Sequence, residues 1–586
     1  MLTTLNLIDM ISERLSKYAK FFKLQRRDLE RNYEMYANTS LSSLFTDGKA
    51  FYGTVEGISE QGHLILNFET KFTPRLKVPM VLCVLKQQSY SDYGADISEW
   101  NCSSIKFREN LNAHTSFSDT LPIYFLNNKK TIGCGQVRYE LIDAIKSALE
   151  QHRVLKFVML ETLPPTELLK NLADYIALHP DDLNLDLRPY RTYDQWQPQE
   201  LSKADDIASQ VLKSLEVEDR CILQGPPGTG KSFTLGEIIN RITLEGKKVC
   251  VTTQSNASLT SLVSQDTLKP FVERGGKIFK TVLTAEELKR HPFLLPAEKG
   301  LTIPDGALLC STYYTLSRII NEVKEPIYDL IVIEEASQAF MTAISAFSRL
   351  GKKCLIVGDP MQLPPVVEIN NESEYVDIDV DTQANGMMTY VRSLDIPSYR
   401  ITTSYRLTSK SASQTKCFYG GNLISVKEKI FDFEAPDQLS KFFPKEGGTI
   451  LYQTPGCVGA NYSNEALDLI RKIVAFFCNC HPKKRLAILT PFVLSTKKLQ
   501  EEFFNKSRQI DILIETINRI QGETVDYTIY YIPARNNSFA YSENLFNVAT
   551  SRSRSTTLII SDVPFEYTNF PSNKVLKFIR ECDIVK

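Results

Sequence analysis

The feature that most constrains this chain is a glycine-rich segment at residues 225–232, which reads GPPGTGKS. It follows the apolar run CILQ and precedes the amphipathic stretch FTLGEIINRI, so we expect a strand, a tight loop and a helix in that order. Glycines let backbone N–H groups approach phosphate oxygens, and the start of the helix adds partial positive charge. The predicted phosphate-binding loop consists of Gly225, Pro226, Pro227, Gly228, Thr229, Gly230, Lys231 and Ser232.

Within this loop, two side chains have predicted chemical roles. Lys231 is expected to reach the β- and γ-phosphates of a nucleoside triphosphate, and the Ser232 hydroxyl is expected to bind Mg²⁺. A loop of this kind needs carboxylates on a neighbouring strand, and the run DLIVIEE supplies Glu334 and Glu335 at its end. We expect Glu334 to hold the metal through its hydration shell and Glu335 to orient and deprotonate water. Taken alone, the acidic pair would also fit a solvated strand end.

Short β-rich runs alternate with amphipathic stretches after Trp196, in two series. The first series is CILQG at 221, KVCVTT at 248, ALLCST at 307, DLIVIEE at 329 and KCLIVGD at 353. The second is TILYQ at 449, RLAILTP at 485, ILIETI at 512, YTIYYIP at 527 and TLIISD at 557. Apolar strands between helices imply parallel sheets covered on both faces. The sequence therefore predicts an α/β fold with two consecutive units.

The N-terminal third has a different texture. Helical spacing of apolar residues predicts a helix from residue 4 to about 36, whereas FYGTVEGI, HLILNF and VPMVLCVL suggest a small antiparallel barrel or sheet. Helical patterning returns over 136–185. The predicted domains are a helical stalk (1–45), a β-barrel-like accessory domain (46–135), a helical stalk or linker (136–195), a first α/β domain (196–395) and a second one (396–586).

Composition excludes several classes of protein. The 586 residues are 43% hydrophobic and 23% charged, which argues against disorder. The formal charge of −1 means that any nucleic-acid binding must come from local grooves and not from a bulk basic field. The 12 cysteines are scattered; Cys478, Cys480 and His481 lack a second pair at zinc-ligand spacing, so reduced thiols are expected. Without an apolar leader or a membrane-length apolar run, we expect a cytoplasmic protein with no membrane partner.

Several strings together resemble the superfamily 1 helicases, and most closely the 5′-to-3′ branch that includes the nonsense-mediated-decay RNA helicase and the replication-associated nuclease-helicase. The likeness covers roughly residues 200–562 and keeps the family's order. The matching strings are GPPGTGKS (motif I), TTQSNASL (Ia), CST at 310–312, IEEASQA (II), GDPMQLPPV (III), SYR at 404–406 (IV) followed by FYGGNL, TINRIQGETVD (V) and NVATSRSR (VI). The resemblance implies two tandem RecA-like P-loop domains, with a helical stalk and a small β-barrel placed ahead of motif I.

The resemblance also implies roles for residues outside the phosphate loop. Gln362 would sense the γ-phosphate, Tyr405 would stack on the nucleotide base, and Glu523 would accept hydrogen bonds from the ribose. Arg406 and Arg552 would act as arginine fingers on the γ-phosphate, a task that suits planar, bidentate guanidinium groups. Surface ion pairs are the alternative for the two arginines. The cofactors implied are ATP and Mg²⁺.

In this family a single strand crosses both RecA-like domains and is held mostly through phosphate and sugar. On that resemblance, the residues that would lie in the groove of the single strand, where small hydroxyl and amide groups suit backbone contacts, are Ser255, Asn256, Thr312, Thr490, Pro491 and Thr516. Each of these side chains could equally be a cap or turn residue. The sequence leaves RNA and DNA open as the track, because the distinction depends on 2′-hydroxyl contacts.

Two positions depart from the family pattern. Motif II usually begins Asp-Glu, whereas this chain has Glu334-Glu335, and the extra methylene could alter the magnesium geometry and slow hydrolysis. The family also tends to place a glutamine upstream of motif I to read adenine. The matching position here is Asp205, with Gln210 nearby, so adenine selectivity is less secure than triphosphate binding.

The prediction is an ATP- and magnesium-dependent helicase or translocase that moves 5′ to 3′ on single strands. Hydrolysis would open and close a cleft between the two RecA-like domains. One alternative is a nucleic-acid-stimulated ATPase that remodels complexes without unwinding. The other is a nucleotide-binding scaffold subunit of a defence or repair complex, which Glu334 and Asp205 would favour.

Overall fold

The computed structural model describes residues 4–58, 64–68, 80–84, 102–107, 118–119, 123–127, 131–134, 139–152, 155–283, 285–427, 434–454, 461–479, 483–503, 510–535 and 537–585. Two compact units account for the chain: residues 1–23, 167–496 and 510–586 form the first, and residues 24–166 and 497–509 form the second. No helix among the described residues combines the length and the apolar character needed to cross a bilayer.

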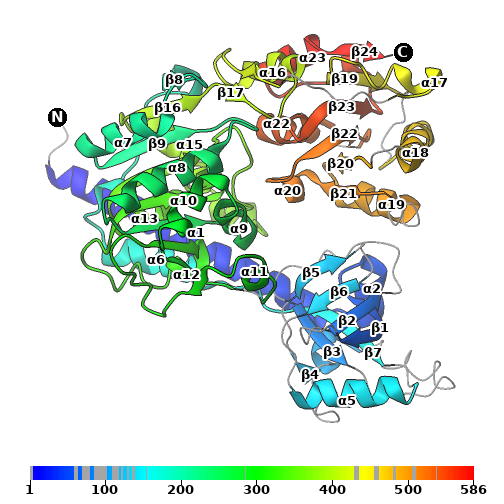
Figure 1. Ribbon diagram of the computed structural model, residues 1–586, viewed down its shortest axis with the longest axis horizontal. Coiled ribbons are helices and arrows are strands. Elements are labelled where there is room, and N and C mark those ends of the chain that lie inside the picture. Colours follow the sequence, from blue (N-terminus) through cyan, green and yellow to red (C-terminus); the bar gives the residue numbers. More distant parts are fainter. Residues whose placement is uncertain are drawn as a thin grey trace. The chain divides into compact units, whose positions relative to one another are not determined.

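The first unit contains two large sheets in which every strand pairing is parallel (Figure 1). The strands of the nine-stranded sheet, in spatial order, are β12 (Leu294–Pro296), β11 (Ile278–Lys280), β13 (Leu308–Thr312), β10 (Val249–Thr253), β14 (Tyr328–Ile333), β15 (Gly351–Gly358), β9 (Arg220–Gln224), β16 (Ser398–Ile401) and β8 (Gln199–Leu201). Every strand of the first series that the sequence predicted lies in this sheet. The tandem parallel α/β prediction is confirmed.

Helices cover both faces of the nine-stranded sheet. One face packs apolar side chains of α7 (Ile207–Val217), α8 (Lys231–Leu244), α9 (Asn256–Val263) and α10 (Lys269–Glu273) against β9, β10, β13 and β14. Further helices of this half are α6 (Glu167–Leu178), α11 (Ala285–Arg290), α12 (Tyr313–Leu316), α13 (Met341–Ser348), α14 (Val380–Ala384) and α15 (Gly386–Ser393). Coverage on both faces explains why β10 and β13 are buried at every residue and begin with apolar runs.

The six-stranded sheet forms the other half of the first unit. Its strands, in spatial order, are β21 (Ile512–Thr516), β20 (Leu486–Thr490), β22 (Val525–Ile532), β23 (Ser553–Ser561), β19 (Gly448–Gln453) and β24 (Asp583–Val585). Its helices are α16 (Ser409–Thr415), α17 (Asp437–Ser440), α18 (Asn464–Asn479), α19 (Val493–Phe503), α20 (Ile517–Ile520), α21 (Asn537–Ala540), α22 (Glu543–Thr550) and α23 (Asn573–Arg580). A short parallel pair, β17 (Thr403–Ser404) with β18 (Ile424–Ser425), follows β16.

The first sheet extends beyond the predicted domain boundary at 395. Strand β16 pairs in parallel with β9 and with β8, so residues 398–401 belong to the sheet that carries the phosphate loop. The sequence placed this short segment in the second α/β domain because only its pairing partners, which are far away in sequence, identify its sheet. The predicted domain limits otherwise stay predictions.

The second unit is built on an antiparallel seven-stranded sheet. Its strands, in spatial order, are β4 (Ser118–Asp119), β3 (Met80–Val84), β7 (Lys156–Glu161), β1 (Phe51–Ile58), β2 (Leu64–Phe68), β6 (Thr131–Cys134) and β5 (Ile123–Asn127). Helix α5 (Tyr139–Glu150) packs Ile145 and Ala148 against one face, where Phe157 and Met159 of β7 also lie. The opposite face packs against α2 (Leu41–Asp47) and the end of α1 (Thr4–Asn38).

Strand β7 was expected to be part of a helical segment. Phe157 and Met159 lie in one hydrophobic cluster, whereas Val158 and Leu160 lie in another, so the strand is buried on both faces. A strand covered on both faces loses the alternation of apolar and polar residues that identifies it in a sequence. The segment 136–195, predicted as a helical stalk or linker, therefore contains one strand that its sequence pattern did not reveal.

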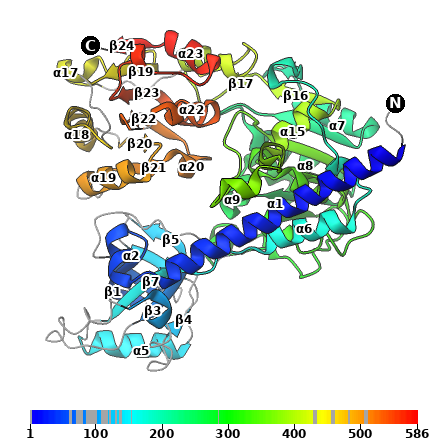
Figure 2. The same ribbon diagram turned by 180° about the vertical axis from the view of Figure 1, so that it is seen from behind.

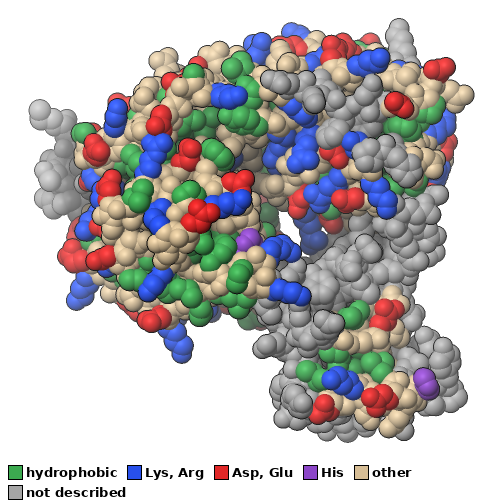
Figure 3. All heavy atoms as spheres, viewed as in Figure 1, with side chains coloured by type: hydrophobic (Ala, Val, Ile, Leu, Met, Phe, Trp, Pro, Cys, Tyr) green, Lys and Arg blue, Asp and Glu red, His purple; other side chains and the backbone are tan. Residues whose placement is uncertain are grey.

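Helix α1 (Thr4–Asn38) confirms the predicted N-terminal helix. Figure 2 shows α1 as one long helix. In the first unit, its Phe21 and Phe22 pack edge-on against Phe340, at 5.9 and 5.5 Å between ring centroids. Basic and acidic side chains alternate over the described part of the face in Figure 3, in line with the formal charge of −1. Cys480 and His481 lie outside the described residues, and Cys478 is a free cysteine.

Candidate nucleotide-binding site

The phosphate loop joins β9 to α8 at the carboxyl edge of the first sheet. Gly228 and Gly230 have φ angles of +73° and +80°, in the left-handed region that glycine adopts without a Cβ penalty. A Cβ on Gly225 would lie 2.1 Å from Cγ of Lys231, so this position also requires glycine. Lys231 Nζ donates to the carbonyl of Gly225 at 2.9 Å. The loop that the sequence predicted is therefore present with its lysine folded over it.

The register of the sheet brings the predicted acidic pair to the same edge. Gln224 of β9 pairs with Gly358 of β15, and Ile333 of β14 pairs with Ile356 of β15. Both β9 and β14 are thus neighbours of β15, and they end opposite residues of β15 that are only two positions apart. As a result, the loop that begins at Gly225 and the carboxylates that follow Ile333 share one carboxyl edge, where ligands of open α/β sheets bind.

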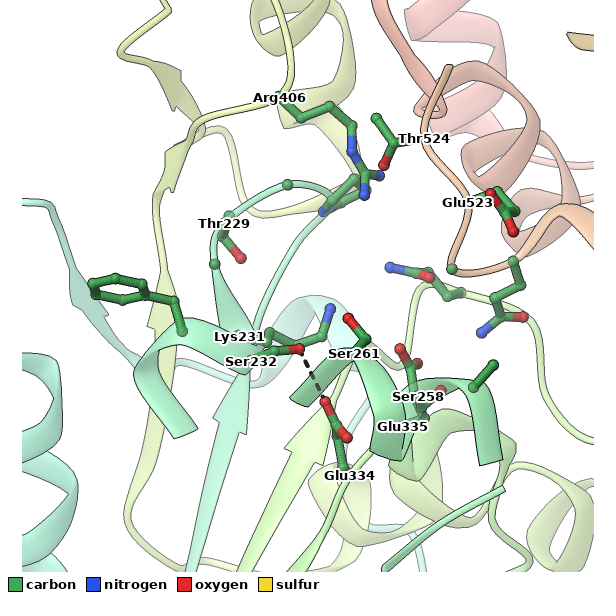
Figure 4. A pocket seen from close by; sticks show the side chains of 18 of the residues that line it. Thr229, Lys231, Ser232, Ser258, Ser261, Glu334, Glu335, Arg406, Glu523 and Thr524 are labelled. Carbon is green, nitrogen blue, oxygen red and sulfur yellow. Dashed lines mark hydrogen bonds between the residues drawn. The ribbon is translucent and has the colours of Figure 1, made fainter. Parts of the chain in front are cut away.

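Ser232 and Glu334 form the predicted metal pair. Ser232 Oγ donates to Glu334 Oε1 at 3.2 Å, the bond drawn as a dashed line in Figure 4. Glu334 is buried, and its Oε2 has no hydrogen-bond partner. Burial, with Glu335 adding to it, raises the pKa of Glu334 to about 8. An orphaned carboxylate oxygen beside a hydroxyl is a donor set that fits Mg²⁺, and a divalent cation would restore the ionised form.

The two predicted arginines reach the site from beyond the first sheet. Arg552, at the start of β23, is 2% exposed, and its Nη2 donates to Oε1 of Gln362 at 3.5 Å. Arg406 Nη1 donates to the carbonyl of Ser551 at 3.3 Å. Burial lowers the pKa of Arg552, and burial together with Arg552 lowers that of Arg406 to about 9. Among the described residues, neither guanidinium forms an ion pair with a carboxylate, so the site holds positive charge that a polyanion would neutralise.

Motif III lies between these groups. Gln362 Nε2 donates to Oδ2 of Asp359 at 3.0 Å, and Tyr419 Oη donates to the same oxygen at 2.7 Å. Gln224 Nε2 donates to the other carboxylate oxygen of Asp359 at 3.1 Å. Asn547 Nδ2 donates to Tyr419 Oη at 2.7 Å. Asp359 is therefore a buried acceptor that connects the strand before the phosphate loop with residues of the second α/β half.

The phosphate loop, the acidic pair, Gln362 and the two arginines line one cavity of about 720 Å³. In Figure 4, Lys231, Ser232 and Glu334 lie on one side, Arg406 points in from above, and Glu523 and Thr524 lie opposite. The predicted residues that line the cavity are Pro227, Gly228, Thr229, Gly230, Lys231, Ser232, Ser255, Glu334, Glu335, Gln362, Arg406, Glu523 and Arg552. Side chains from two sheets thus surround a space large enough for a nucleoside triphosphate.

Two predicted nucleotide contacts have further features. Glu523 Oε2 accepts a hydrogen bond from Arg485 Nη1 at 2.8 Å, so its carboxylate is partly engaged before any ribose binds. Tyr405 is 52% exposed, and its backbone N–H donates to the carbonyl of Gly228 at 2.8 Å. Asp205, the position matching the adenine-reading glutamine, accepts from the N–H and the hydroxyl of Ser202, at 2.7 and 2.9 Å. Its carboxylate closes a local turn.

The residues predicted to contact a nucleic-acid strand differ in their burial and in their hydrogen bonds. Ser255 is the N-cap of α9 and lines the cavity, whereas the Asn256 amide donates to Glu287 at 3.2 Å, beside buried Lys280. The Thr312 hydroxyl caps α12. Thr490 is fully buried and its hydroxyl has no partner.

Pro491 and Thr516 are partly exposed, at the ends of β20 and β21. These two residues are therefore accessible to a nucleic-acid strand, whereas the buried Thr490 hydroxyl is not accessible in this conformation.

Sequence reasoning missed the polar residues that surround motif III. Asn544 and Asn547, three residues apart on α22, donate to the carbonyls of Gln362 and Met361 at 2.5 and 2.8 Å. Asn547 is the first residue of the motif VI string, and Asn544 lies three residues before it on the same helical face. This spacing was a signal that could have identified the pair from the sequence. Tyr419 lies within the quoted FYGGNL string, but nothing in the local sequence identifies Asp359 as its partner.

Comparison with known proteins agrees with this geometry. Two family models, each described as an AAA domain, match residues 202–282 with 302–369 and residues 385–564. The chain is 22% identical over 386 residues to the DNA replication ATP-dependent helicase/nuclease DNA2 of Saccharomyces cerevisiae, across 60% of this chain and 25% of DNA2. This chain belongs to the superfamily 1 helicases. That family consists of ATP-hydrolysing enzymes.

A second helicase relative, an uncharacterized ATP-dependent helicase of Methanocaldococcus jannaschii, is 21% identical over 477 residues, across 64% of this chain and 70% of that protein. By contrast, the chain spans only about a quarter of the length of DNA2. Among solved helicase structures, arterivirus nonstructural protein 10 matches with a TM-score of 0.35 and 11% identity, covering 88% of this chain and 77% of that chain. The matched family segments contain the phosphate loop, both motif II carboxylates and both arginines.

Proposed function

We propose that this protein hydrolyses Mg²⁺-ATP in the cavity between its two RecA-like halves and uses the cycle to move 5′ to 3′ along a single strand of DNA or RNA. Strand separation would follow where the moving protein meets a duplex. The direction of movement rests on the resemblance to the 5′-to-3′ branch of the family. Binding to nucleic acid is supported by the helicase relatives, one of which is named as a DNA replication helicase/nuclease.

The observation that carries this proposal is the convergence of Lys231, Glu335 and Gln362 from one sheet with Arg406 and Arg552 from beyond it. In the proposed cycle, the cavity is complete only when the charged side chains of both halves surround the nucleotide. Because the two guanidiniums lack carboxylate partners among the described residues, a bound triphosphate would supply the missing negative charge. A ligand that neutralises both arginines would hold the halves together, and loss of the γ-phosphate would release them.

Each charged group has a proposed task. Lys231 and the loop amides hold the β- and γ-phosphates, and Glu335 accepts the proton of the attacking water. Ser232 and Glu334 would hold Mg²⁺, which supplies Lewis-acid stabilisation of the charge that develops on the phosphate oxygens. Arg406 and Arg552 donate to the γ-phosphate oxygens as they become more negative, and fingers of this kind can increase turnover by about 10³–10⁵.

Coupling to the track is proposed to run through motif III. Gln362 contacts Arg552 on one side, and the Asp359 carboxylate that orients it accepts from Tyr419 on the other. A change at the γ-phosphate would therefore shift groups of both halves. A strand would cross partly exposed positions such as Ser255, Pro491 and Thr516, with contacts mainly to phosphate and sugar.

The test measures ATP turnover with and without matched single-stranded RNA and DNA, followed by unwinding of duplexes with a 5′ or a 3′ tail. We expect stimulation by a single strand and displacement only from the 5′ tail. Arg552→Ala should abolish turnover, with Arg580→Ala, an exposed arginine at the end of α23 that does not line this cavity, as its control. Stimulation without displacement would favour the remodelling ATPase, and absence of hydrolysis would favour the scaffold.

A further inference from the structure

Helix α9 has one polar face toward the nucleotide cavity and another toward a buried charged pair. Its N-cap Ser255, together with Ser258 and Ser261, lines the cavity, at intervals of three residues that share one helical face. Figure 4 labels Ser258 and Ser261 among the side chains that surround this space. Glu523 and Thr524 of the second half line the same cavity. Helix α9 is therefore part of the wall on which the second half would close in the proposed cycle.

A helix as short as α9 needs support from the rest of the fold. It has eight residues, and isolated helices shorter than about 12–15 residues are marginal in water. Its apolar residues Leu259, Leu262 and Val263 pack into the core of the first half. Apolar contacts are non-directional, so they fix the rotation of the helix about its axis only weakly. Hydrogen bonds have preferred angles, and on another face of α9 they would fix the direction in which the serines point.

Lys280 of β11 and Glu287 of α11 supply these hydrogen bonds. The Lys280 side chain is fully buried, and its Nζ donates to Glu287 Oε1 at 3.0 Å and to Asn256 Oδ1. The carbonyl of Val282 accepts the third hydrogen bond of the ammonium, at 2.6 Å. Glu287 Oε1 also accepts from Asn256 Nδ2 at 3.2 Å and from the Thr260 hydroxyl. Asn256 and Thr260 lie four residues apart, on one face of α9.

The end of α11 also contacts the end of α9. Nε2 of His291, which directly follows α11, forms a hydrogen bond of 3.1 Å with Oγ of Ser264, the C-cap of α9. Asn256, Thr260 and Ser264 follow one another at intervals of four residues. Lys280 and the segment of α11 therefore hold α9 at its beginning, its middle and its end, on a face that does not contain the cavity-lining serines.

Stability alone is a weak reason for a buried ion pair at this place. Removal of an ammonium and a carboxylate from water is unfavourable, and apolar residues of similar volume are often as stable in such positions. Charge-assisted hydrogen bonds, however, have defined directions and lengths. A pair that binds two side chains on one face of a short helix is therefore suited to setting the position of that helix.

We propose that Lys280 and Glu287 are positioning residues, which hold α9 in the orientation that lets the second half close over bound nucleotide. This inference rests on the proposed nucleotide-binding function and adds residues that act on it through α9. The phosphate loop holds the triphosphate without α9, so nucleotide affinity does not depend on the pair. Turnover depends on it, because hydrolysis needs Arg406 and Arg552 at the γ-phosphate in the closed cavity.

The test measures kcat and KM for ATP in wild type, Glu287→Ala and Glu287→Gln, together with amide hydrogen exchange of residues 256–263 and 521–524. Glu287→Ala should lower kcat about tenfold and change KM by less than about threefold. Exchange of the α9 amides should become about tenfold faster, because the helix opens locally more often. Glu287→Gln keeps an oxygen that can accept from Asn256 and Thr260, so its kcat should stay within about threefold of wild type.

Ile344→Ala is the control for loss of stability. Ile344 is a fully buried residue of α13, outside the apolar cluster that contains α9, and it does not line the cavity. Truncation leaves a void and lowers stability without removing a hydrogen bond of α9. At a temperature where all variants are folded, its kcat should equal that of wild type. A tenfold fall in this variant as well would mean that kcat follows stability, and the positioning role would be wrong.

An unchanged kcat in Glu287→Ala, or a rise in KM as large as the fall in kcat, would also overturn the proposal. If wild type shows no hydrolysis, the proposed function fails, and a non-hydrolysable ATP analogue tests the positioning role separately. The analogue should slow exchange at 521–524 in wild type and not in Glu287→Ala, although both proteins bind it. Equal protection of 521–524 in the two proteins, or equal exchange of their α9 amides, would refute the positioning role.

Discussion

Removal of one hydroxyl group should uncouple the two halves of the nucleotide site. Tyr419 Oη donates to Oδ2 of Asp359 and accepts from Asn547 Nδ2, each at 2.7 Å. All three side chains are at most 1% exposed. Asp359 follows β15 of the first sheet, whereas Asn547 lies on α22 of the second half. Tyr419→Phe keeps the ring and removes only the hydrogen bonds that connect them.

The expected cost follows from these contacts. A hydrogen bond to a carboxylate contributes about 1.5–3 kcal/mol, and a buried donor left without a partner costs about 1–3 kcal/mol. Asn547 Nδ2 keeps its bond to the carbonyl of Met361, and the Tyr419 carbonyl keeps its bond from Arg400 Nη1 at 3.0 Å. We therefore expect Tyr419→Phe to lower the free energy of unfolding by about 2–4 kcal/mol.

Turnover should fall as well. Tyr419 and Gln362 donate to the same oxygen of Asp359, so loss of the hydroxyl changes the group that orients Gln362 beside Arg552. We expect kcat to fall about tenfold, equivalent to about 1.4 kcal/mol, with KM for ATP nearly unchanged. Urea unfolding followed by tryptophan fluorescence and steady-state ATP hydrolysis measure the two effects.

Tyr530→Phe is the matched control. Tyr530 is also fully buried, and its hydroxyl donates at 2.6 Å to the carbonyl of Ala540, within the second half. Its removal should cost about 0.5–1.5 kcal/mol of stability and leave kcat unchanged. If the two variants reduced kcat equally, the reduction would reflect loss of stability, and the proposed coupling through Asp359 would be wrong.

Three further substitutions test other parts of the site. Glu335→Gln should lower turnover by at least about a hundredfold while nucleotide still binds, measured by fluorescent nucleotide titration; retained turnover would remove its role as general base. In magnesium-free buffer, Glu334→Gln should raise the melting temperature more at pH 8.5 than at pH 6. Burial raises the folded-state pKa to about 8 from an ordinary 4.5, so the wild type loses stability as pH rises through this range. A pH-independent difference between the two proteins would contradict this account. Glu287→Ala leaves the buried Lys280 ammonium without its carboxylate at 3.0 Å and should cost about 3 kcal/mol in urea unfolding, with Glu287→Gln intermediate.

Much of the first unit follows from local patterns. The phosphate loop, the acidic pair after β14 and the apolar strands of both series are each defined by neighbouring residues. Burial on both faces makes parallel strands such as β10 and β22 mostly apolar, and this signal survives without knowledge of their partners. The same property concealed β7, because a short apolar run between two helices is ambiguous until its pairing with β1 and β3 is known.

The candidate site also has a part that local motifs predict and a part that only the fold determines. Lys231, Ser232 and Glu334 were predicted from motifs whose chemistry requires those residue types at that spacing. Asn256 and Thr490 were predicted as strand contacts from equally local strings. The fold directs the Asn256 amide to Glu287 and buries the Thr490 hydroxyl. Motif strings identify the loops of a site but do not specify the direction of each side chain.

The sequence by itself determined that a triphosphate loop and its carboxylates lie on a parallel α/β scaffold, because glycine conformations and strand hydrophobicity act over a few consecutive residues. Only the tertiary structure decided which distant groups meet there. Tyr419 reaches Asp359, and Arg552 reaches Gln362, through sheet register and packing between segments far apart in the chain. Such contacts depend on the order in which strands pair, and no local run of residues encodes that order.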